Sequence, residues 1–358
     1  MNKKLGLVGL AFVTASMLAA CGGGNTAKDT AKDTAKEEPK TLVISTFGLE
    51  EDKMQEDVFK PFEKKYNVDI VLETGTSSER FTKLKSNPNS TVDVIELSQS
   101  NAADGVAEGL FEKIDSSKVP NMQNLIDSAK QLSADGSGPA YTLNSIGIVY
   151  NKKAAGMEIK EWDDLWDPSL KGKISIPDIT TTFGPAMLTV ASEHENVDIT
   201  TDKGKAAFKG ITDLAPNVVK TYSKSSDLAN MFQSGEIVAA VVGDFAVPLI
   251  TGSNSDVAYV VPQSGTYANF NTININKNSK NKDLAYKYID WRLSKEVQEK
   301  TAVSLNEAPT NKEVVLDDEA AKNKTYGDVA ARTNKVDPLF VNKNLESWIN
   351  QWNRILNK

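Results

Sequence analysis

The fold of this chain is decided by residues 265–311, which read GTYANFNTININKNSKNKDLAYKYIDWRLSKEVQEKTAVSLNEAPTN. Polar and apolar side chains alternate around Ile273 and Ile275, the period-two pattern of a half-buried strand. After a polar turn, Asp283 is placed to cap a helix, and Ser294 to cap a second, shorter one. The apolar face of the first helix consists of Leu284, Ala285, Tyr288, Ile289 and Leu293. Residues 307–311 close the stretch as a predicted turn.

Strand-like and helix-like runs alternate in the first part of the chain. Residues 41–46, 68–72 and 92–95 are apolar enough for buried strands, with helix-like patterns between them. This alternation is typical of a parallel sheet covered by helices on both faces. Ligands of such sheets bind at the carboxyl ends of the strands. The loops 46–51 and 96–101 are therefore predicted to face a cleft.

A second set of strands follows. Residues 139–151 predict a pair of strands that cross into a second lobe, and 174–178 and 257–262 predict two more. The run 238–242 is so apolar that we expect it to be buried on both faces. It stops at Gly243-Asp244-Phe245, a further predicted cleft loop. A chain of 358 residues has room for two domains.

Several segments, taken in their order, resemble one protein family. They are Glu108–Asp115 (EGLFEKID), Glu161–Ile174 (EWDDLWDPSLKGKI), Lys280–Asp283 with Ala285 and Tyr288-Ile289, and Pro309–Asn311. Together they resemble the extracellular solute-binding proteins of ABC importers, specifically the spermidine/putrescine-binding branch. The resemblance implies an α/β, two-lobed periplasmic-binding-protein type II fold. Each lobe would be a mainly parallel sheet flanked by helices, and two strands would form the hinge.

The resemblance also sets the expected domain boundaries. Lobe 1 is predicted to comprise residues 41–144 plus 266–358, and lobe 2 residues 145–265. The tryptophans of the 161–174 segment are expected to pack within the protein and not against ligand. A later stripe with helical spacing is expected to be core, and it consists of Trp348, Ile349, Trp352 and Ile355.

The first forty residues predict export and membrane attachment. Residues 1–20 read as a signal peptide, because two lysines precede an apolar run too short to span a bilayer. Met17–Cys21 (MLAAC) resembles a bacterial lipobox, which implies cleavage before Cys21 and a lipid on its sulfur. The alternative is an ordinary signal peptide with an incidental cysteine. Residues 21–40 nearly repeat TAKD without large apolar side chains, so a flexible tether is predicted after the lipidated Cys21.

Composition argues against several functional classes. The chain has 41 basic and 48 acidic residues, a net charge of −7, so nucleic acid is not an expected partner. With one Cys and one His, we expect no disulfide framework, no metal site and no cofactor. His194 lies in a polar run that reads as surface, and no base stands beside a nucleophile. A binding protein is therefore expected, with an enzyme on the same scaffold and a surface adhesin as rivals.

The resemblance places candidate ligand-binding residues on the predicted cleft loops. The family's first loop, an aromatic–Thr pair, falls on Thr46 and Phe47. Its second loop, with Ser and Tyr, falls on Leu97 or Ser98 and on Gln99, so the tyrosine is missing. The final turn carries a Tyr in the relatives and Glu307 here.

The remaining family positions depart from the pattern. The acidic pair of the second lobe falls on Ile179 and Thr182, with Asp178 adjacent and Thr180 between. The Trp that ends the buried strand falls on Val242, with Asp244 two residues on. The Trp and Asp of the return strand fall on Asn269 and Asn271. Three carboxylates of the relatives are thus absent, so the architecture matches the family better than the ligand code does.

Two ligand classes remain open at this point. Asp178, Asp244 and Glu307 could rebuild a site for the ammonium groups of a polyamine, spermidine or putrescine, which is the first expectation. Alternatively Ser98, the threonines 180–182 and Asn271 supply hydroxyls and amides at a helix N-terminus, which favour a small carboxylate or phosphonate. Each candidate also has a purely structural interpretation, as a cap, a rim residue or core.

The sequence therefore predicts a monomeric substrate-binding lipoprotein of an ABC importer, anchored by lipid on the outer face of a bacterial cell membrane. It is expected to capture a small polar solute between its lobes, to close around it, and to present it to a permease and its ATPase.

Overall fold

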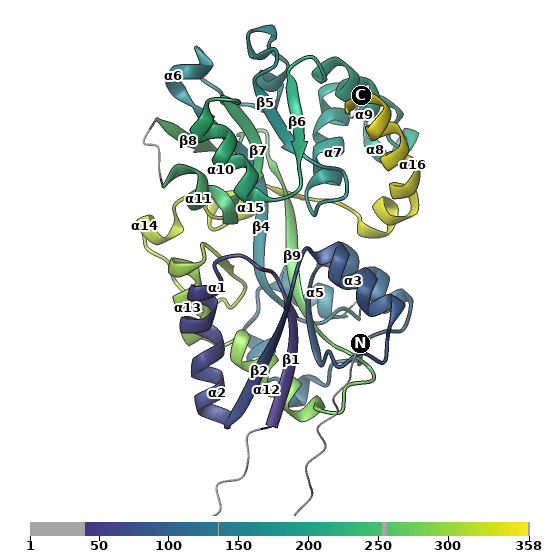
Figure 1. Cartoon of the computed structure of the whole chain (residues 1–358), viewed down its shortest axis with the longest axis vertical. Helices are drawn as coiled ribbons and strands as arrows, with labels where there is room; N and C mark the ends of the chain where they lie inside the picture. The colour runs from purple at the N-terminus through teal and green to yellow at the C-terminus, as the bar shows by residue number, and fades with distance from the viewer. Residues whose placement is uncertain (1–39, 135, 253–255, 357–358) are drawn as a thin grey trace, which may run out of the picture. The chain divides into compact units, whose positions relative to one another are not determined.

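Two long antiparallel strands run through the middle of the molecule, β4 (Ala140–Asn151) and β9 (Thr266–Ile275) (Figure 1). The computed structural model describes residues 40–356 except 135 and 253–255. The sheet has the order β2-β1-β3-β9-β4-β7-β5-β6. The first half of β4 pairs with β9, and its second half with β7, so one strand belongs to the sheets of both lobes. The predicted two-strand hinge of a type II fold is confirmed, but the pair of strands predicted at 139–151 is a single strand, β4.

Lobe 1 is built on a parallel trio of strands next to β9, namely β2 (Val68–Thr74), β1 (Lys40–Thr46) and β3 (Val94–Ser98). On its other side, β3 pairs with β9 in the antiparallel direction. The helices of this half are α1 (Glu51–Met54), the π-helical η1 (Gln55–Phe59), α2 (Lys60–Tyr66), α3 (Ser77–Ser86), α4 (Gln99–Ala107), η2 (Ser116–Lys118), η3 (Pro120–Asn124), α5 (Asp127–Ala134), α12 (Lys282–Arg292) and α13 (Lys295–Ser304).

Hydrophobic cores cover both faces of this sheet because successive strand residues point to opposite sides. Val94 lies in one core with Phe62 and Ile289, whereas the next residue, Ile95, lies in another with Phe81. Helices on both sides supply these cores, as the alternation of strands and helices predicted.

Of the two helix caps predicted in residues 265–311, one is confirmed and the other is not. The Ser294 side chain caps α13 by accepting from the Val297 N–H. The α12 helix, however, begins at Lys282 after Asn281, so the prediction that Asp283 caps it was wrong. Asp283 lies in the first turn, where its negative charge still complements the helix dipole.

Lobe 2 repeats the arrangement with a second parallel trio, β7 (Ala239–Gly243), β5 (Ile174–Pro177) and β6 (Val218–Tyr222), and β8 (Val257–Val260) pairs antiparallel with β4. Its helices are α6 (Lys152–Ala155), η4 (Trp162–Trp166), η5 (Pro168–Leu170), α7 (Gly184–His194), α8 (Ile199–Asp202), α9 (Lys205–Leu214), α10 (Ser225–Ser234), η6 (Asp244–Ala246) and α11 (Val247–Thr251). In β7, Val241 faces one core and Val242 another, which confirms burial on both faces.

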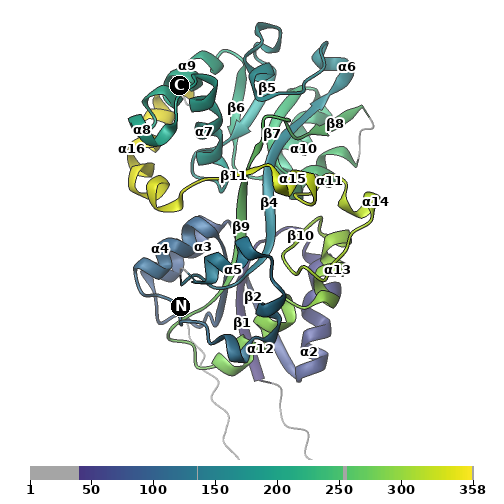
Figure 2. The ribbon, with the colours of Figure 1, turned by 180° about the vertical axis from the view of Figure 1, so that it is seen from behind.

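The C-terminal part of the chain departs from the expectation. Residues after 311 form α14 (Asp318–Ala321), α15 (Asp328–Ala331), β11 (Thr333–Lys335) and α16 (Pro338–Leu356). Trp348 and Trp352 are buried as predicted, but in the core of lobe 2, and Figure 2 shows α16 beside α8 and α9. The start of α16 contacts lobe 1 as well, because Asn342 accepts from the Ser100 hydroxyl and donates to Asp104 Oδ1, both at 2.6 Å. The helix therefore lies against both lobes, and the lobe boundaries remain a prediction.

The predicted turn at 307–311 contains a short strand, β10 (Ala308–Pro309), which pairs with Leu143 and Thr142 of β4. This pairing holds the segment against the strand that crosses between the lobes.

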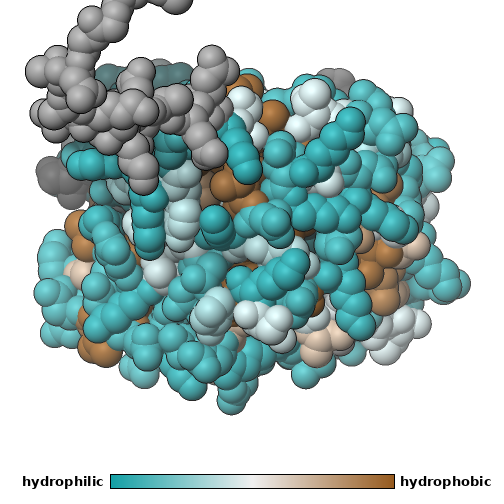
Figure 3. Space-filling view, turned by 90° about the horizontal axis from the view of Figure 1, so that it is seen from below, coloured by the Kyte–Doolittle hydropathy of each residue, from teal (hydrophilic) through white to brown (hydrophobic). Residues whose placement is uncertain are grey.

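The outer surface of lobe 1 is mostly polar. Figure 3 views that end from below and shows hydrophilic side chains broken by small hydrophobic patches. Within the described part of the chain, we find no helix both long and apolar enough to cross a bilayer. The signal peptide, Cys21 and the tether lie outside the described residues.

Candidate functional site

A cavity of about 120 Å³ lies between the lobes, where the strands β1, β3 and β7 end. Lobe 2 contributes only Thr182, Phe183 and Phe245, and lobe 1 with the crossing strands supplies the rest. The complete lining consists of Thr46, Phe47, Leu49, Met54, Glu96, Tyr141, Thr142, Asn144, Thr182, Phe183, Phe245, Asn269, Asn271, Arg292, Leu305 and Glu307. The site combines aromatic walls with amides, hydroxyls and three charged side chains.

The three charged side chains of this lining, Glu96, Arg292 and Glu307, lie close to one another. Arg292, the last residue of α12, is completely buried, and its Nη2 donates to Oε1 of Glu307 at 2.6 Å. Its Nε lies 3.8 Å from Oε1 of Glu96, which is 1% exposed. Burial lowers the pKa of Arg292, but Glu307 and Glu96 outweigh this effect and the pKa is raised. Arg292 is therefore charged at every physiological pH.

Glu96 is held in place from the lobe 1 side. Its Oε2 accepts from the Thr46 hydroxyl at 2.6 Å, and its Oε1 from the Tyr288 hydroxyl at 2.9 Å. A second buried cation, Arg80, donates to the carbonyl oxygens of Gly75 and Ser45. Burial lowers the pKa of Arg80 to about 10, although Glu96 acts in the opposite direction. Glu96 thus interacts electrostatically with two buried guanidinium groups, those of Arg292 and Arg80.

Half of the sequence-predicted ligand residues line this cavity. They are Thr46, Phe47, Thr182, Asn271 and Glu307. The guanidinium of Arg80 lies 4.6 Å from the ring centroid of Phe47, which fixes that ring at the cavity. The role of these five residues in binding stays a prediction.

Ser98 and Gln99 do not line the cavity. The Ser98 N–H donates to the Ser77 hydroxyl at 3.0 Å, and the Gln99 Oε1 accepts from the Phe270 N–H at 3.2 Å. These bonds tie the start of α4 to α3 and β9. The two side chains therefore hold the cleft loop in place, and their role in ligand binding stays a prediction.

Asp178 and Thr180 are also outside the lining, at the edge of lobe 2. The Thr180 N–H and hydroxyl both donate to Asp178 Oδ1, at 3.0 and 2.6 Å, so the carboxylate is used in a local turn. The Ser78 hydroxyl of lobe 1 donates to the Thr180 carbonyl at 3.3 Å. Thr180 thus contacts the other lobe, and the role of Asp178 and Thr180 in ligand binding stays a prediction.

Asp244 is buried behind the cavity wall instead of facing it. Its Oδ2 accepts from the Thr325 N–H at 2.8 Å and from the Thr325 hydroxyl, and its backbone carbonyl accepts from Asn306 Nδ2 at 2.7 Å. Burial raises its pKa to about 7, against the opposing effect of the Thr325 hydrogen bonds. Burial lowers the pKa of the nearby Lys324, although the negative charge of Asp244 acts in the opposite direction. Asp244 thus joins the end of β7 to the C-terminal segment.

Asp244 should make folding stability depend on pH. Its folded pKa of about 7 exceeds the unfolded value of about 3.9, so its contribution is complete below about pH 4 and is lost as pH rises through about 7. The free energy of unfolding should fall by up to about 1.4 kcal/mol per pH unit in that range. We expect Asp244→Asn to flatten this decline in urea titrations at several pH values. The exposed Asp227→Asn is the control. A wild-type pH profile in Asp244→Asn would contradict the assignment.

Sequence reasoning missed the most buried charges of the site. Glu96 begins a loop that topology placed at the cleft, yet it was not chosen as a binding residue. Arg292 follows Tyr288 by four residues and Ile289 by three, so it occupies the apolar face of α12. A charged residue on a buried helical face was the signal that could have found it.

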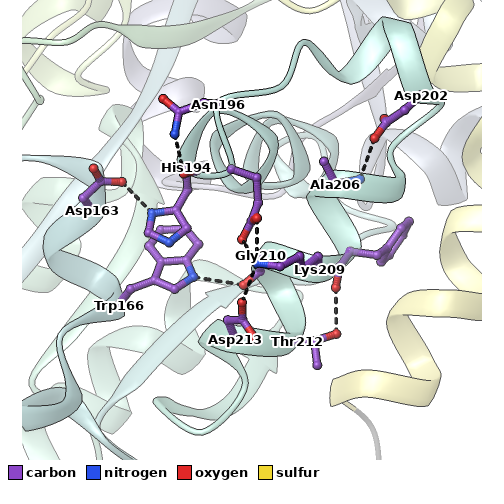
Figure 4. Close-up of polar contacts among 12 residues, drawn as sticks. Asp163, Trp166, His194, Asn196, Asp202, Ala206, Lys209, Gly210, Thr212 and Asp213 are labelled. Atoms are coloured by element: carbon purple, nitrogen blue, oxygen red, sulfur yellow. Dashed lines mark hydrogen bonds and ion pairs between the residues drawn. The ribbon is translucent and has the colours of Figure 1, made fainter.

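The aromatic segment of lobe 2 packs within the protein, as predicted. Trp162 Nε1 donates to the Gly265 carbonyl, and Trp166 Nε1 donates to that of Gly210, both at 2.9 Å. In Figure 4 the ring of His194 stacks on Trp166, with centroids 4.1 Å apart. Asp163 Oδ1 is 2.7 Å from the His194 Nδ1. The histidine expected at the surface is thus half-covered by Trp166.

A larger cavity, of about 470 Å³, lies outside the cleft between α7–α8 and α16. Its lining includes Glu193, Asp198 and Asp337 beside the buried Tyr267. We prefer the smaller cavity as the candidate site, because it lies at the carboxyl ends of strands from both sheets and contains fully buried charged groups.

The hinge, the two sheets and the cavity between them define a two-lobed α/β binding protein. A model of the family described as bacterial extracellular solute-binding protein matches residues 57–327. The chain belongs to this family, whose members are substrate-binding components of ABC transporters and occupy an extracellular or periplasmic position.

Individual relatives agree on the fold and differ in their ligands. A crystal structure of an ABC transporter from Clostridium perfringens is 58% identical and covers 88% of this chain and 100% of its own, with a TM-score of 0.77. The spermidine/putrescine-binding periplasmic protein of Escherichia coli K12 is 26% identical over 75% of this chain and 78% of its own. A binding protein from A. tumefaciens in complex with agropinic acid is 23% identical, covers 89% and 99%, and has a TM-score of 0.74, which bears on the fold alone.

Proposed function

We propose that this chain captures a small polar solute in the cavity between its lobes and delivers it to a membrane permease driven by an ATPase. The observation that supports this is a lining that combines Thr182, Phe183 and Phe245 of lobe 2 with buried charged groups of lobe 1. A solute that contacts both lobes would shift the open–closed equilibrium toward the closed form. Binding and release require no catalytic group, so we propose no enzymatic activity.

Two observations favour different solutes. The names of the relatives favour a polyamine, spermidine or putrescine, and Glu307 and Glu96 are carboxylates that ammonium groups could approach. Against this, Asp178 and Asp244 do not line the cavity, and Arg292 adds a buried positive charge beside it. A polycation gains little there, because it must approach a guanidinium. The alternative, a small solute with an anionic group, fits that cation.

We propose further that the protein acts as a monomer tethered to the outer face of the membrane by a lipid on Cys21. The supporting observation is the MLAAC sequence after an apolar run. One acyl chain anchors weakly and two anchor stably. An unmodified Cys21 thiol in membrane-derived protein, measured by mass spectrometry, would contradict the anchor.

Thermal unfolding with a metabolite panel tests the capture of a solute. A ligand at 100 times its Kd should stabilise the protein by about 2.7 kcal/mol, which raises the Tm by several degrees. The panel should include putrescine, spermidine, amino acids, dicarboxylates and phosphonates. Asp227→Asn, an exposed change away from the cavity, should shift in parallel with the parent. A complete absence of stabilisation, together with no solute in native mass spectra of freshly isolated protein, would contradict the proposed function.

A further inference from the structure

The Arg292 guanidinium is buried with part of its hydrogen-bonding capacity unused. Of its three nitrogens, only Nη2 has a hydrogen-bond partner among the described residues, the Oε1 of Glu307 at 2.6 Å. Nε lies 3.8 Å from Oε1 of Glu96, an ion pair without a hydrogen bond, and Nη1 has no hydrogen-bond partner there, although the whole residue is 0% exposed. Leaving donors of a buried cation unpaired is costly, since charged groups lose hydration on burial. Such unpaired donors are therefore expected at a site where a bound ligand accepts the remaining hydrogen bonds.

The unused donors belong to a residue of the cavity lining, and an unused acceptor lies next to them. The ring of Tyr141 covers one face of the guanidinium, with its centroid 4.3 Å from Cζ. The N–H groups lie in the guanidinium plane, so the Tyr141 ring does not occupy the directions in which they donate. Glu307 Oε2 is also buried without a hydrogen-bond partner in the described residues, and Glu307 lines the same cavity. Free donors and a free acceptor thus come from one ion pair.

The charges around the cavity select between classes of solute. The lining contains Glu96, Arg292 and Glu307, and the nearby Arg80 balances Glu96. A dication would leave an excess of positive charge in a buried site, and a dianion an excess of negative charge, each of which is costly. A solute with one cationic and one anionic group leaves the balance unchanged. The amides of the lining add no charge, and they are hydrogen-bonded to one another, from Asn269 Nδ2 to Asn271 Oδ1 at 2.9 Å and from Asn271 Nδ2 to Asn144 Oδ1 at 3.2 Å.

Size points in the same direction. A cavity of about 150 Å³ holds one benzene molecule, which has six non-hydrogen atoms. The cavity of about 120 Å³ therefore suits a solute of roughly five non-hydrogen atoms. The walls Phe47, Phe183 and Phe245 would contact its carbon skeleton.

We propose that the solute is a small amino-acid-like zwitterion, whose carboxylate accepts from Nε and Nη1 of Arg292 and whose amine donates to Oε2 of Glu307. This inference rests on the proposed capture function and specifies its ligand. Arg292 and Glu307 then determine specificity, because an analogue that lacks either group leaves a buried charge unpaired.

Calorimetric titration of the full-length chain tests the proposal. The probes are the standard amino acids, putrescine, spermidine and, for each amino acid that binds, its deaminated carboxylate. We expect at least one amino acid to bind and Arg292→Gln to weaken it by ~30-fold or more, the factor that follows from losing one partner of a buried charged contact. Lys287→Gln removes a positive charge from an exposed position of the same helix and should leave the affinity unchanged.

Glu307→Gln provides a second, independent readout if Arg292→Gln fails to fold by circular dichroism. It should weaken the amino acid at least ~10-fold and the deaminated carboxylate hardly at all. Binding of putrescine or spermidine that survives Arg292→Gln would overturn this inference while leaving the capture function intact. A natural ligand without an oxyanion in native mass spectra would do the same. If no probe and no natural solute binds, both proposals fail.

Discussion

Trp352→Ala should lower the free energy of unfolding by about 3–5 kcal/mol, the usual cost of deleting a large buried aromatic side chain. Trp352 is 0% exposed and lies in the main core of lobe 2 with residues of β4, β5 and α7. Its indole nitrogen has no hydrogen-bond partner among the described residues, so the loss should report packing alone. Urea unfolding followed by circular dichroism measures the change.

The same helix supplies the control. Glu346→Ala, at an exposed position of α16, should change stability by no more than about 0.5 kcal/mol. Hydrogen exchange should locate the destabilisation of Trp352→Ala in lobe 2, in α7 and α9. Faster exchange confined to α12 of lobe 1 would contradict the packing of α16 and support the boundary expected from the sequence.

Glu96→Ala should destabilise the protein by about 3–5 kcal/mol, because removing one member of a buried charged group leaves its partners unpaired. Glu96 is 1% exposed, accepts from the hydroxyls of Thr46 and Tyr288, and interacts electrostatically with Arg80 and Arg292. Without Glu96, the burial of the Arg80 charge loses its main compensating negative charge. The hydroxyls of Thr46 and Tyr288 also lose their hydrogen-bond acceptor. Thermal and urea unfolding should both show the loss.

An exposed ion pair offers the matched comparison. Glu112 Oε2 lies 2.7 Å from Lys282 Nζ, with side chains 32% and 36% exposed. Solvent-exposed pairs of this geometry contribute little, so Glu112→Ala should cost less than about 1 kcal/mol. Equal losses for Glu96→Ala and Glu112→Ala would show that burial does not control the energetics of the charged site.

The candidate site was predictable in its location and only partly in its members. Topology placed the loops 46–51 and 96–101 at the cleft, and Thr46, Phe47 and Glu96 indeed line the cavity. Asp178 and Asp244 were expected there from their sequence neighbourhood, yet local turns and the Thr325 contact use their carboxylates. Position along the chain does not fix the direction of a side chain at the end of a strand, because a neighbour distant in sequence can bind it first.

Sequence by itself determined the elements and their class. The spacing of apolar residues identified the return strand around Ile273 and Ile275 and the Trp348/Trp352 stripe, because that spacing shows which side of an element is buried. The continuous apolar run 238–242 identified the strand that is buried on both faces. The family motifs then fixed the two-lobed architecture.

Only the tertiary structure decided which partners those faces meet. It packed Trp348 and Trp352 of α16 into the core of lobe 2, because an apolar stripe specifies burial without specifying which surface covers it. It also brought Arg292, Glu96 and Glu307 together from three separate elements. An unpaired charge is costly only after folding has removed the water around it, so the interactions among these three side chains cannot be inferred from the sequence.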